Sequence, residues 1–428
     1  MSIRSKLAVC GLLPMLAFGV AACGDDEEPA GGGGGASSEA GGGEASGTVS
    51  VYSSLPLQGA SKDQTNAMVD GIKLALKEAG NKAGNVNIKY TSLDDSTAQA
   101  GNWDPQQTAA NARKVAQDKA AVAYIGEFNS GASAISIPII NQIGLAQISP
   151  ANTYVGLTTD EPGSEKGEPA KYYPAGTRTY ARIVPRDTIQ AAALVTQMKT
   201  DGCTKVAIAN DKETYGAGLT RVVELNAKEQ GVSIVGNEGI QKDAANFRAV
   251  ASKFKGQGAD CFLFSGVTAN GAVQMYKDVA SAMPEAQLYG PDGVCESGFT
   301  NPEKDGIPKA IGAKFKCTVA TLDLKSYPGG QEFIQAFQGE YGEDNPDPYA
   351  IYGYEAMQLV IDTIKAAGAE GTSREGVLKA LFQTKDRESV LGTYSIDENG
   401  DTTLTDYGLY KVGEDGDPTF DSTIKAAA

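Results

Sequence analysis

The chain has 428 residues, a formal net charge of −16 at pH 7 and no histidine. This acidic balance argues against nucleic-acid binding, which depends on basic patches. The missing histidines remove the commonest general base, the usual nucleophile pairs and most zinc sites. We therefore expect no enzyme, no metal site and no cofactor.

The first 23 residues have the pattern of an export signal. Arg4 and Lys6 precede an apolar run over 7–20, and small residues stand directly before Cys23. This ending resembles the lipobox of bacterial lipoproteins, whose cysteine carries a diacylglycerol. A membrane-spanning helix is disfavoured because the run is shorter than the about 20 residues that a bilayer requires and contains Pro14. We expect residues 1–23 to be a lipoprotein signal, with lipid on Cys23 anchoring an extracytoplasmic protein to the cell membrane.

Residues 24–47 form a tract rich in Gly, Ser, Ala and Glu. Such a composition buries too little apolar surface to fold, so it predicts a flexible tether.

From Thr48 onward, apolar β-branched runs alternate with helical patterns, which is typical of parallel sheets with crossover helices. A first unit predicts strands over 49–52, 86–90, 121–125 and 146–148 and helices over 65–79, 105–118 and from 133. A second unit predicts helices over 189–199, 218–230, 246–255 and 270–280 and strands over 205–209, 232–235, 261–264, 287–290 and 313–319. Helices over 330–341 and 349–366 follow, and then a hairpin from Gly392 with a turn at 397–400. This length exceeds one ordinary core, so we expect two doubly wound lobes with a ligand in the cleft between them.

Four cysteines lie beyond Cys10 and Cys23, namely Cys203, Cys261, Cys295 and Cys317. An even number in an exported protein favours disulfides, although four cysteines allow three pairings. A site that binds metal through all four thiolates is disfavoured because no close C-x2-C spacing is present.

Short motifs along the chain resemble the type I periplasmic-binding-protein family, in particular the branched-chain amino acid and amide receptors of ABC transporters. The matching stretches are DGIKLA at 70–75, LDD at 93–95, IG at 125–126 with SGAS at 130–133, ISPANT at 148–153, RIVP at 182–185, NDK at 210–212 with YGAG at 215–218, GPDG at 290–293, and LG at 391–392 with IDENG at 396–400. The resemblance covers nearly the whole chain after the tether and depends on the order of these motifs.

The resemblance implies two Rossmann-like lobes joined by three crossings, near Val184, over 318–322 and near Leu391. Lobe one would comprise 48–183 plus 322–389, and lobe two would comprise 184–321 plus 390–428. It also implies the disulfides Cys203–Cys261 and Cys295–Cys317, because the family's fold places the strands beside these cysteines next to each other.

The implied function is that of a monomeric solute-binding receptor that closes around a branched-chain-type amino acid and delivers it to an ABC transporter permease. In the family, groups at the positions of Ser130, Ala151 and Thr153 hold the ligand's carboxylate. N–H and O–H donors at helix N-termini suit that task, although both hydroxyl residues could simply be helix caps. Tyr215 would cover the ligand, and Asp292 would pair with its ammonium group. The plainer alternatives are a loop tyrosine and a turn aspartate.

Three departures from the family's pattern leave the ligand open. Val267 stands where a second tyrosine is common, and Gln64 lies near the place of another aromatic residue. The loop over 158–180 is longer than usual, and it could contact the ligand or the permease. An amide, a urea-like ligand or an aromatic carboxylate therefore stays open beside an amino acid, and so does a role as a ligand sensor. An exported hydrolase is disfavoured because histidine and a G-x-S-x-G elbow are absent.

Overall fold

The computed structural model describes residues 45–425. The expected signal, Cys23 and nearly all of the tether lie outside these residues. Within residues 45–425, no helix combines the length and apolar character needed to cross a bilayer.

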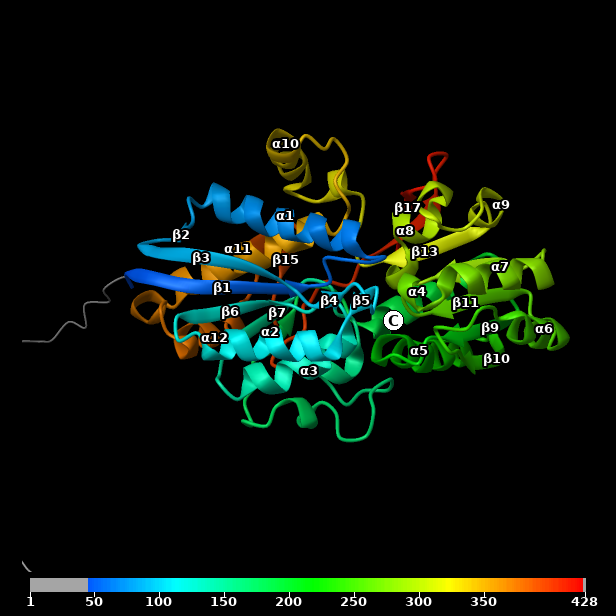
Figure 1. Cartoon of the computed structure of the whole chain (residues 1–428), viewed down its shortest axis with the longest axis horizontal. Coiled ribbons are helices and arrows are strands. Elements are labelled where there is room, and N and C mark those ends of the chain that lie inside the picture. The colour runs from blue at the N-terminus through cyan, green and yellow to red at the C-terminus, as the bar shows by residue number, and fades with distance from the viewer. Residues whose placement is uncertain (1–44, 426–428) are drawn as a thin grey trace, which may run out of the picture. The chain divides into compact units, whose positions relative to one another are not determined.

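Lobe one is built on a six-stranded sheet with the order β2-β3-β1-β6-β7-β8. Its strands are β1 (Gly47–Leu55), β2 (Lys82–Ala83), β3 (Val86–Asp94), β6 (Ala121–Gly126), β7 (Ala146–Ser149) and β8 (Tyr180–Arg182). All pairs except β2–β3 are parallel, so the carboxyl ends of the strands meet at one edge. The helices of this lobe are α1 (Lys62–Glu78), α2 (Pro105–Gln117), α3 (Ser130–Asn141), α10 (Gly330–Tyr341), α11 (Ala350–Ala366) and α12 (Arg374–Phe382). Figure 1 shows that α11 and α12, from late in the chain, lie against the early strands.

Lobe two is built on a seven-stranded sheet with the order β10-β9-β11-β12-β13-β16-β17. Its strands are β9 (Lys205–Asn210), β10 (Ser233–Gly239), β11 (Cys261–Ser265), β12 (Gln287–Gly290), β13 (Phe315–Val319), β16 (Tyr407–Val412) and β17 (Pro418–Ile424). The first five are parallel, and β16 and β17 add an antiparallel hairpin at one end. The helices are α4 (Asp187–Thr200), α5 (Thr214–Gln230), α6 (Arg248–Gly256), α7 (Ala272–Ala282), α8 (Ser297–Thr300) and α9 (Lys309–Gly312).

The predicted fold class is confirmed, and the differences lie mainly at helix starts and near the C-terminus. Helix α3 begins at Ser130 rather than 133, and α5 begins at Thr214 rather than 218. Their first turns contain Gly, Ser and Thr, which carry no apolar periodicity. The hairpin expected from Gly392 is present only as one antiparallel bridge between Ile396 and Thr402, because β15 (Gly392–Tyr394) pairs with the preceding β14 (Arg387–Ser389). The expected turn at 397–400 is present, and the C-terminal hairpin is formed by β16 and β17.

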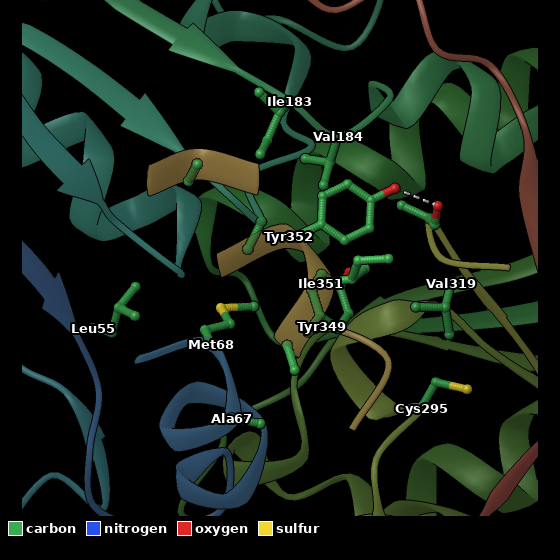
Figure 2. Packing of buried hydrophobic residues seen from close by; sticks show 14 of the residues in the cluster. Leu55, Ala67, Met68, Ile183, Val184, Cys295, Val319, Tyr349, Ile351 and Tyr352 are labelled. Carbon is green, nitrogen blue, oxygen red and sulfur yellow. Dashed lines mark hydrogen bonds between the residues drawn. The ribbon is translucent and has the colours of Figure 1, made fainter. Parts of the chain in front are cut away.

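A continuous apolar core runs through the crossings between the lobes. Figure 2 shows Ile183 and Val184 of the first crossing near Tyr352 of α11, with Val319 of β13 close by. The hydroxyl of Tyr352 donates to the carbonyl of Ala320 at 2.8 Å, which ties α11 to the second crossing.

The segment that follows Leu391, where the resemblance implies the third crossing, stays in contact with β8. The N–H of Arg182 in lobe one donates to the carbonyl of Gly400 at 2.9 Å. The chain therefore stays against lobe one through the turn at 397–400, and it joins the sheet of lobe two only at Tyr407.

Arg182, the last residue of β8, is fully buried and joins several segments. Its Nε lies 2.7 Å from Oδ1 of Asp401, and its Nη1 donates to the carbonyls of Asn152 at 3.1 Å and Tyr154 at 2.8 Å. Its Nη2 donates to the hydroxyl of Thr158. One guanidinium group thus fixes the loop after β7 to the segment that follows the turn at 397–400.

The four cysteines of lobe two lie in two close pairs. The Cα atoms of Cys203 and Cys261 are 5.8 Å apart, and those of Cys295 and Cys317 are 5.6 Å apart. Both values fall within the about 4.4–6.8 Å that a disulfide tolerates.

Candidate functional site

A cavity lies between the lobes, at the carboxyl ends of strands from both sheets. The space between its lining atoms, counted out into the open solvent at its mouth, is about 480 Å³. Its lining residues are Trp103, Phe128, Asn129, Ser130, Gly131, Ala151, Thr153, Asp211, Glu213, Tyr215, Val267, Asn270, Asp292 and Gly293. The structure thus brings together five of the six residues that the sequence singled out, all except Gln64.

Lobe one contributes uncharged hydrogen-bond donors to the cavity. Ser130 is the first residue of α3, and a helix of this length leaves its first N–H groups without intrahelical partners. The N-cap of α3 is Asn129, so Ser130 is not the cap residue. Ala151 and Thr153 follow β7, and the N–H of Ala151 donates to the Ser149 hydroxyl at 3.2 Å, so a ligand at Ala151 would share this N–H with Ser149. This face suits an anionic group.

Lobe two contributes acidic side chains, namely Asp211, Glu213 and Asp292. None of the residues that line the cavity is a lysine or an arginine. The two walls therefore have opposite preferences. The donors of lobe one favour a negative group, and the carboxylates of lobe two favour a positive one.

Asp292 receives hydrogen bonds only from neutral groups. Its Oδ1 accepts from Nε2 of Gln190 at 2.8 Å and from the Tyr215 hydroxyl, and its Oδ2 accepts from the Tyr349 hydroxyl at 3.0 Å. Burial raises the pKa of Asp292 above its ordinary value, although these hydrogen bonds act in the opposite direction. A ligand cation would supply the positive charge that the carboxylate lacks.

Tyr349 reaches Asp292 from the other lobe. It stands directly before α11 in lobe one, and its ring meets that of Phe128 edge-on, with centroids 6.4 Å apart. The bond between Tyr349 and Asp292 therefore joins the lobes beside the cavity that Asp292 lines.

Asp211 braces the loops of lobe two. Its Oδ2 accepts from Nδ2 of Asn270 at 2.8 Å and from the N–H of Val267 at 3.2 Å, and its Oδ1 accepts from the N–H of Glu213 at 3.0 Å. Burial raises the pKa of Asp211 to about 6. These bonds hold the segments after β9 and β11 together, so Asp211 has a structural task beside the cavity.

Asp187 is a second buried acid next to the site. It begins α4, and its N–H donates to the carbonyl of Thr153 at 2.8 Å. Neither of its carboxylate oxygens has full hydrogen-bond geometry with a partner among the described residues, although the Thr153 hydroxyl lies beside them. Burial raises the pKa of Asp187 to about 8, with Asp292 adding to the shift and Thr153 and Arg182 opposing it.

Gln64 lies elsewhere. It is a buried residue of α1 and lines a separate polar cavity together with Tyr349 and Lys304. Lys304 of lobe two lies 3.0 Å from Asp63 of lobe one in this second cavity. The structure therefore does not bring Gln64 to the cavity that holds the other predicted residues.

The long loop over 158–180 contributes no residue to the cavity lining and instead contacts lobe two. Arg221 of α5 donates from Nε and Nη2 to the carbonyl of Gly163, at 3.0 and 2.8 Å. The same guanidinium group reaches the Tyr154 hydroxyl at 3.2 Å. The loop thus fastens the two lobes beside the cavity.

Several site residues were missed by the sequence analysis, among them Trp103, Phe128, Asp187, Asn270 and Tyr349. Trp103 is the only tryptophan of the chain, which was a usable signal. Asp187, two residues after the RIVP motif, was another. Tyr349 gave no signal, because only the folding of α11 onto lobe one brings it near Asp292.

Comparison with known proteins agrees with this architecture. A family model described as periplasmic binding protein matches residues 49–417. The chain is 27% identical over 376 residues to the Leu/Ile/Val-binding protein homolog 1 of Brucella melitensis, covering 86% of this chain and 92% of that protein.

Two solved structures share the fold. A leucine binding protein from Thermotoga maritima has a TM-score of 0.73 at 20% identity, with 88% of this chain and 98% of that chain covered. A solute binding protein of an ABC transporter from R. palustris, in complex with benzoate, has a TM-score of 0.71 at 20% identity, with coverage of 88% and 96%.

The raised pKa of Asp187 predicts a dependence of stability on pH. The folded-state pKa is about 8 and the ordinary value is 3.8, so the folded protein binds one more proton between these values. The contribution of Asp187 to the free energy of unfolding therefore falls as pH rises in this window, by up to about 1.4 kcal/mol per pH unit. Asp187→Asn removes this loss. Urea unfolding of the ligand-free proteins should show the variant gaining on the wild type between about pH 5 and about pH 7.

Asp201→Asn provides the control for this measurement. Burial alone would raise the pKa of Asp201, but hydrogen bonds from Lys316, Tyr289 and Gln197 hold it below its usual value. Asp201 is therefore ionised in both states over the tested range, and its variant should run parallel to the wild type. A parallel profile for Asp187→Asn as well would contradict the assignment of a proton to Asp187.

Proposed function

This chain belongs to the periplasmic binding protein family, and we propose that it is the extracytoplasmic receptor of an ABC importer for a small amino acid of the branched-chain type. The protein captures its ligand between the lobes as a monomer and presents it to the transporter permease. It performs no chemistry on the ligand.

The observation that carries this proposal is the division of charge across the cavity. Lobe one presents N–H and O–H donors, lobe two presents carboxylates, and the lining residues include no cation. A zwitterion satisfies both walls at once, because its carboxylate meets the donors and its ammonium meets the acids. In this proposal Ser130, Ala151 and Thr153 hold the carboxylate.

On lobe two, Asp292 holds the ammonium and Tyr215 covers the ligand. Asp187 adds a second negative charge behind Thr153 once it gives up its proton. Gln64 receives no role in the ligand cavity, because it lines the separate cavity beside α1.

An aromatic carboxylate is the second candidate, since the benzoate-binding protein shares the fold and aromatic rings line this cavity. Such a ligand would use the donors of lobe one and the rings, but it would leave Asp292 buried without a cation. Burying a carboxylate without a counter-charge is unfavourable, so the acidic wall favours the amino acid.

Asp292→Asn tests the ligand class. The variant keeps the shape of the side chain and removes its charge, so L-leucine should bind about one to two decades more weakly, corresponding to about 1.5–3 kcal/mol for a charge-assisted hydrogen bond. Benzoate, which has no ammonium group, should lose nothing. Isothermal titration calorimetry on the wild type and the variant measures both affinities.

Glu238→Gln is the control, because Glu238 lies outside the cavity lining and pairs with Lys253. It should change the affinity for L-leucine by less than about threefold. Unchanged leucine binding in Asp292→Asn would remove the ammonium assignment. A wild type that binds benzoate and no amino acid would replace the proposed ligand with the aromatic carboxylate.

We further propose that Cys23 carries the lipid that anchors the receptor to the cell membrane. The support comes from the basic and apolar segments before it and from the small residues at 20–22. In cells fed an alkyne-labelled fatty acid, the wild type should incorporate label and sediment with membranes. Cys23→Ser should do neither. Cys10→Ser, within the signal itself, is the control and should keep the label. Label retained in Cys23→Ser would refute the anchor.

We also propose that the two cysteine pairs of lobe two are disulfides in the exported protein. Peptide mapping without reductant should return peptides that link Cys203 to Cys261 and Cys295 to Cys317. The first pair closes a loop with a sequence separation of 58. Replacing both of its cysteines by serine should lower the free energy of unfolding by about 2–4 kcal/mol. Free thiols or other linkages in the map would disprove the assignment.

A further inference from the structure

We propose that Trp103 is a fixed wall of the ligand cavity that selects amino acids by the size of their apolar side chain. The inference rests on the proposed function and names a determinant of specificity within it. Trp103 lines the cavity, and it belongs to a short hairpin between β3 and α2 that the sequence pattern did not predict.

The hairpin holds Trp103 from both sides. Strands β4 (Ser96–Thr97) and β5 (Asn102–Trp103) are paired antiparallel, with Ser96 opposite Trp103. Directly after Trp103, Asp104 caps α2 by accepting the N–H of Gln107 at 2.9 Å, and its own N–H donates to the carbonyl of Asp95 at 2.8 Å. The backbone of Trp103 is therefore fixed between a strand pair and a helix start. Figure 1 draws β4 and β5 at the end of lobe one that faces lobe two.

A second set of bonds fastens the hairpin to the loop after β1. Asp94 accepts the N–H of Leu57 at 3.0 Å and Nε2 of Gln58 at 2.7 Å, and the Ser96 hydroxyl accepts the N–H of Gln58 at 3.0 Å. Gly59 approaches this hairpin so closely that a Cβ there would lie 1.9 Å from the carbonyl oxygen of Gly101. The hairpin is thus a rigid part of lobe one.

The indole ring itself packs on the start of α3. A Cβ on Gly131 would lie 2.7 Å from Cζ2 of Trp103, so only glycine leaves room for the ring in this position. Gly131 follows Ser130, one of the proposed carboxylate donors. The ring is therefore placed at a set position relative to the group that holds the ligand's backbone.

The polar groups of the cavity indicate which part of the ligand the indole ring contacts. The donors of lobe one and the acids of lobe two account for the carboxylate and the ammonium of an amino acid. The apolar surface left for its side chain comes chiefly from Trp103 and Phe128 on lobe one and Val267 on lobe two. A rigid indole in the wall from lobe one and a small valine in the wall from lobe two favour ligand side chains that fill the space between these walls. The methyl group of alanine would bury little apolar surface there.

The test compares selectivity rather than affinity. Calorimetry would give dissociation constants of the wild type, Trp103→Phe and Trp103→Ala for L-alanine, L-valine, L-leucine and L-phenylalanine. Trp103→Ala should weaken leucine binding by roughly 10- to 100-fold and alanine binding by less than about threefold, because only the larger side chain loses contact area. Trp103→Phe should fall between the two. Since Trp103 is the only tryptophan, the emission of the wild type should also change on binding of leucine.

Gly131→Ala provides an independent variant with the tryptophan in place. Its methyl group displaces the ring, so it should reduce the ratio of leucine to alanine affinity as well. Adding it to Trp103→Ala should reduce this ratio no further. Leu225→Ala, on an exposed part of α5, is the control and should bind like the wild type.

The outcomes separate the two proposals. If all four amino acids weaken by the same factor in Trp103→Ala, the residue has only a structural role and the inference is overturned. If the wild type binds none of the four, the proposed function fails and this inference fails with it. A leucine preference that collapses only in the Trp103 and Gly131 variants supports both.

Discussion

The contact between Arg182 and Asp401 is the constraint on which the arrangement of the cavity depends. A guanidinium group with no solvent exposure needs a counter-charge and filled hydrogen bonds, because removing either partner would leave an uncompensated charge in the interior. Arg182 meets this need with Asp401 and with the carbonyls of Asn152 and Tyr154. Since Thr153 lies between these two residues, the same group that ends β8 also sets the position of a wall of the cavity. Arg182 also fixes the first crossing and the segment that follows the turn at 397–400.

A second constraint concerns the buried acids of the cavity, which have no positively charged partner. Asp211 and Asp292 each accept three hydrogen bonds, all from neutral groups, and Asp187 has only a neighbouring hydroxyl. Buried acids of this kind are costly when ionised and alone. A bound ammonium group lowers that cost because it supplies the positive charge that the buried acids lack. The hydrogen bond from Tyr349 to Asp292 shows that this corner of the site is shared by the two lobes.

The sequence was sufficient for the fold and for much of the cavity. Fully apolar runs such as that of β6 give strands without ambiguity, and motifs that follow successive strands converge because parallel strands end at one edge. Ser130, Thr153, Tyr215 and Asp292 were expected together because of the resemblance to the family, and this geometry agrees with that expectation. Trp103 could not be placed, since strands of two residues have no periodicity.

Two further features depended on contacts between distant segments. Tyr349 reaches Asp292 only because the segment that begins α11 packs beside the cavity, and the two residues are 57 positions apart in the chain. The segment after Leu391 stays in contact with β8 because the turn at 397–400 bonds back to Arg182. Short motifs show which residues follow each strand. They do not show which later segment of the chain packs on a sheet formed by earlier residues.

The interleaved path of the chain sets an order in which the lobes can be completed. Strands β9 to β13 come from one uninterrupted segment, residues 205–319, and that segment contains Cys261, Cys295 and Cys317 with Cys203 just before it. Lobe one, in contrast, needs α11 and α12 from residues 350–382 to cover the sheet begun by β1. A polypeptide threaded through a membrane from its N-terminus delivers the parallel part of lobe two while the earlier lobe still lacks those helices. The apolar face that α11 later covers is then the part of the core that stays uncovered longest.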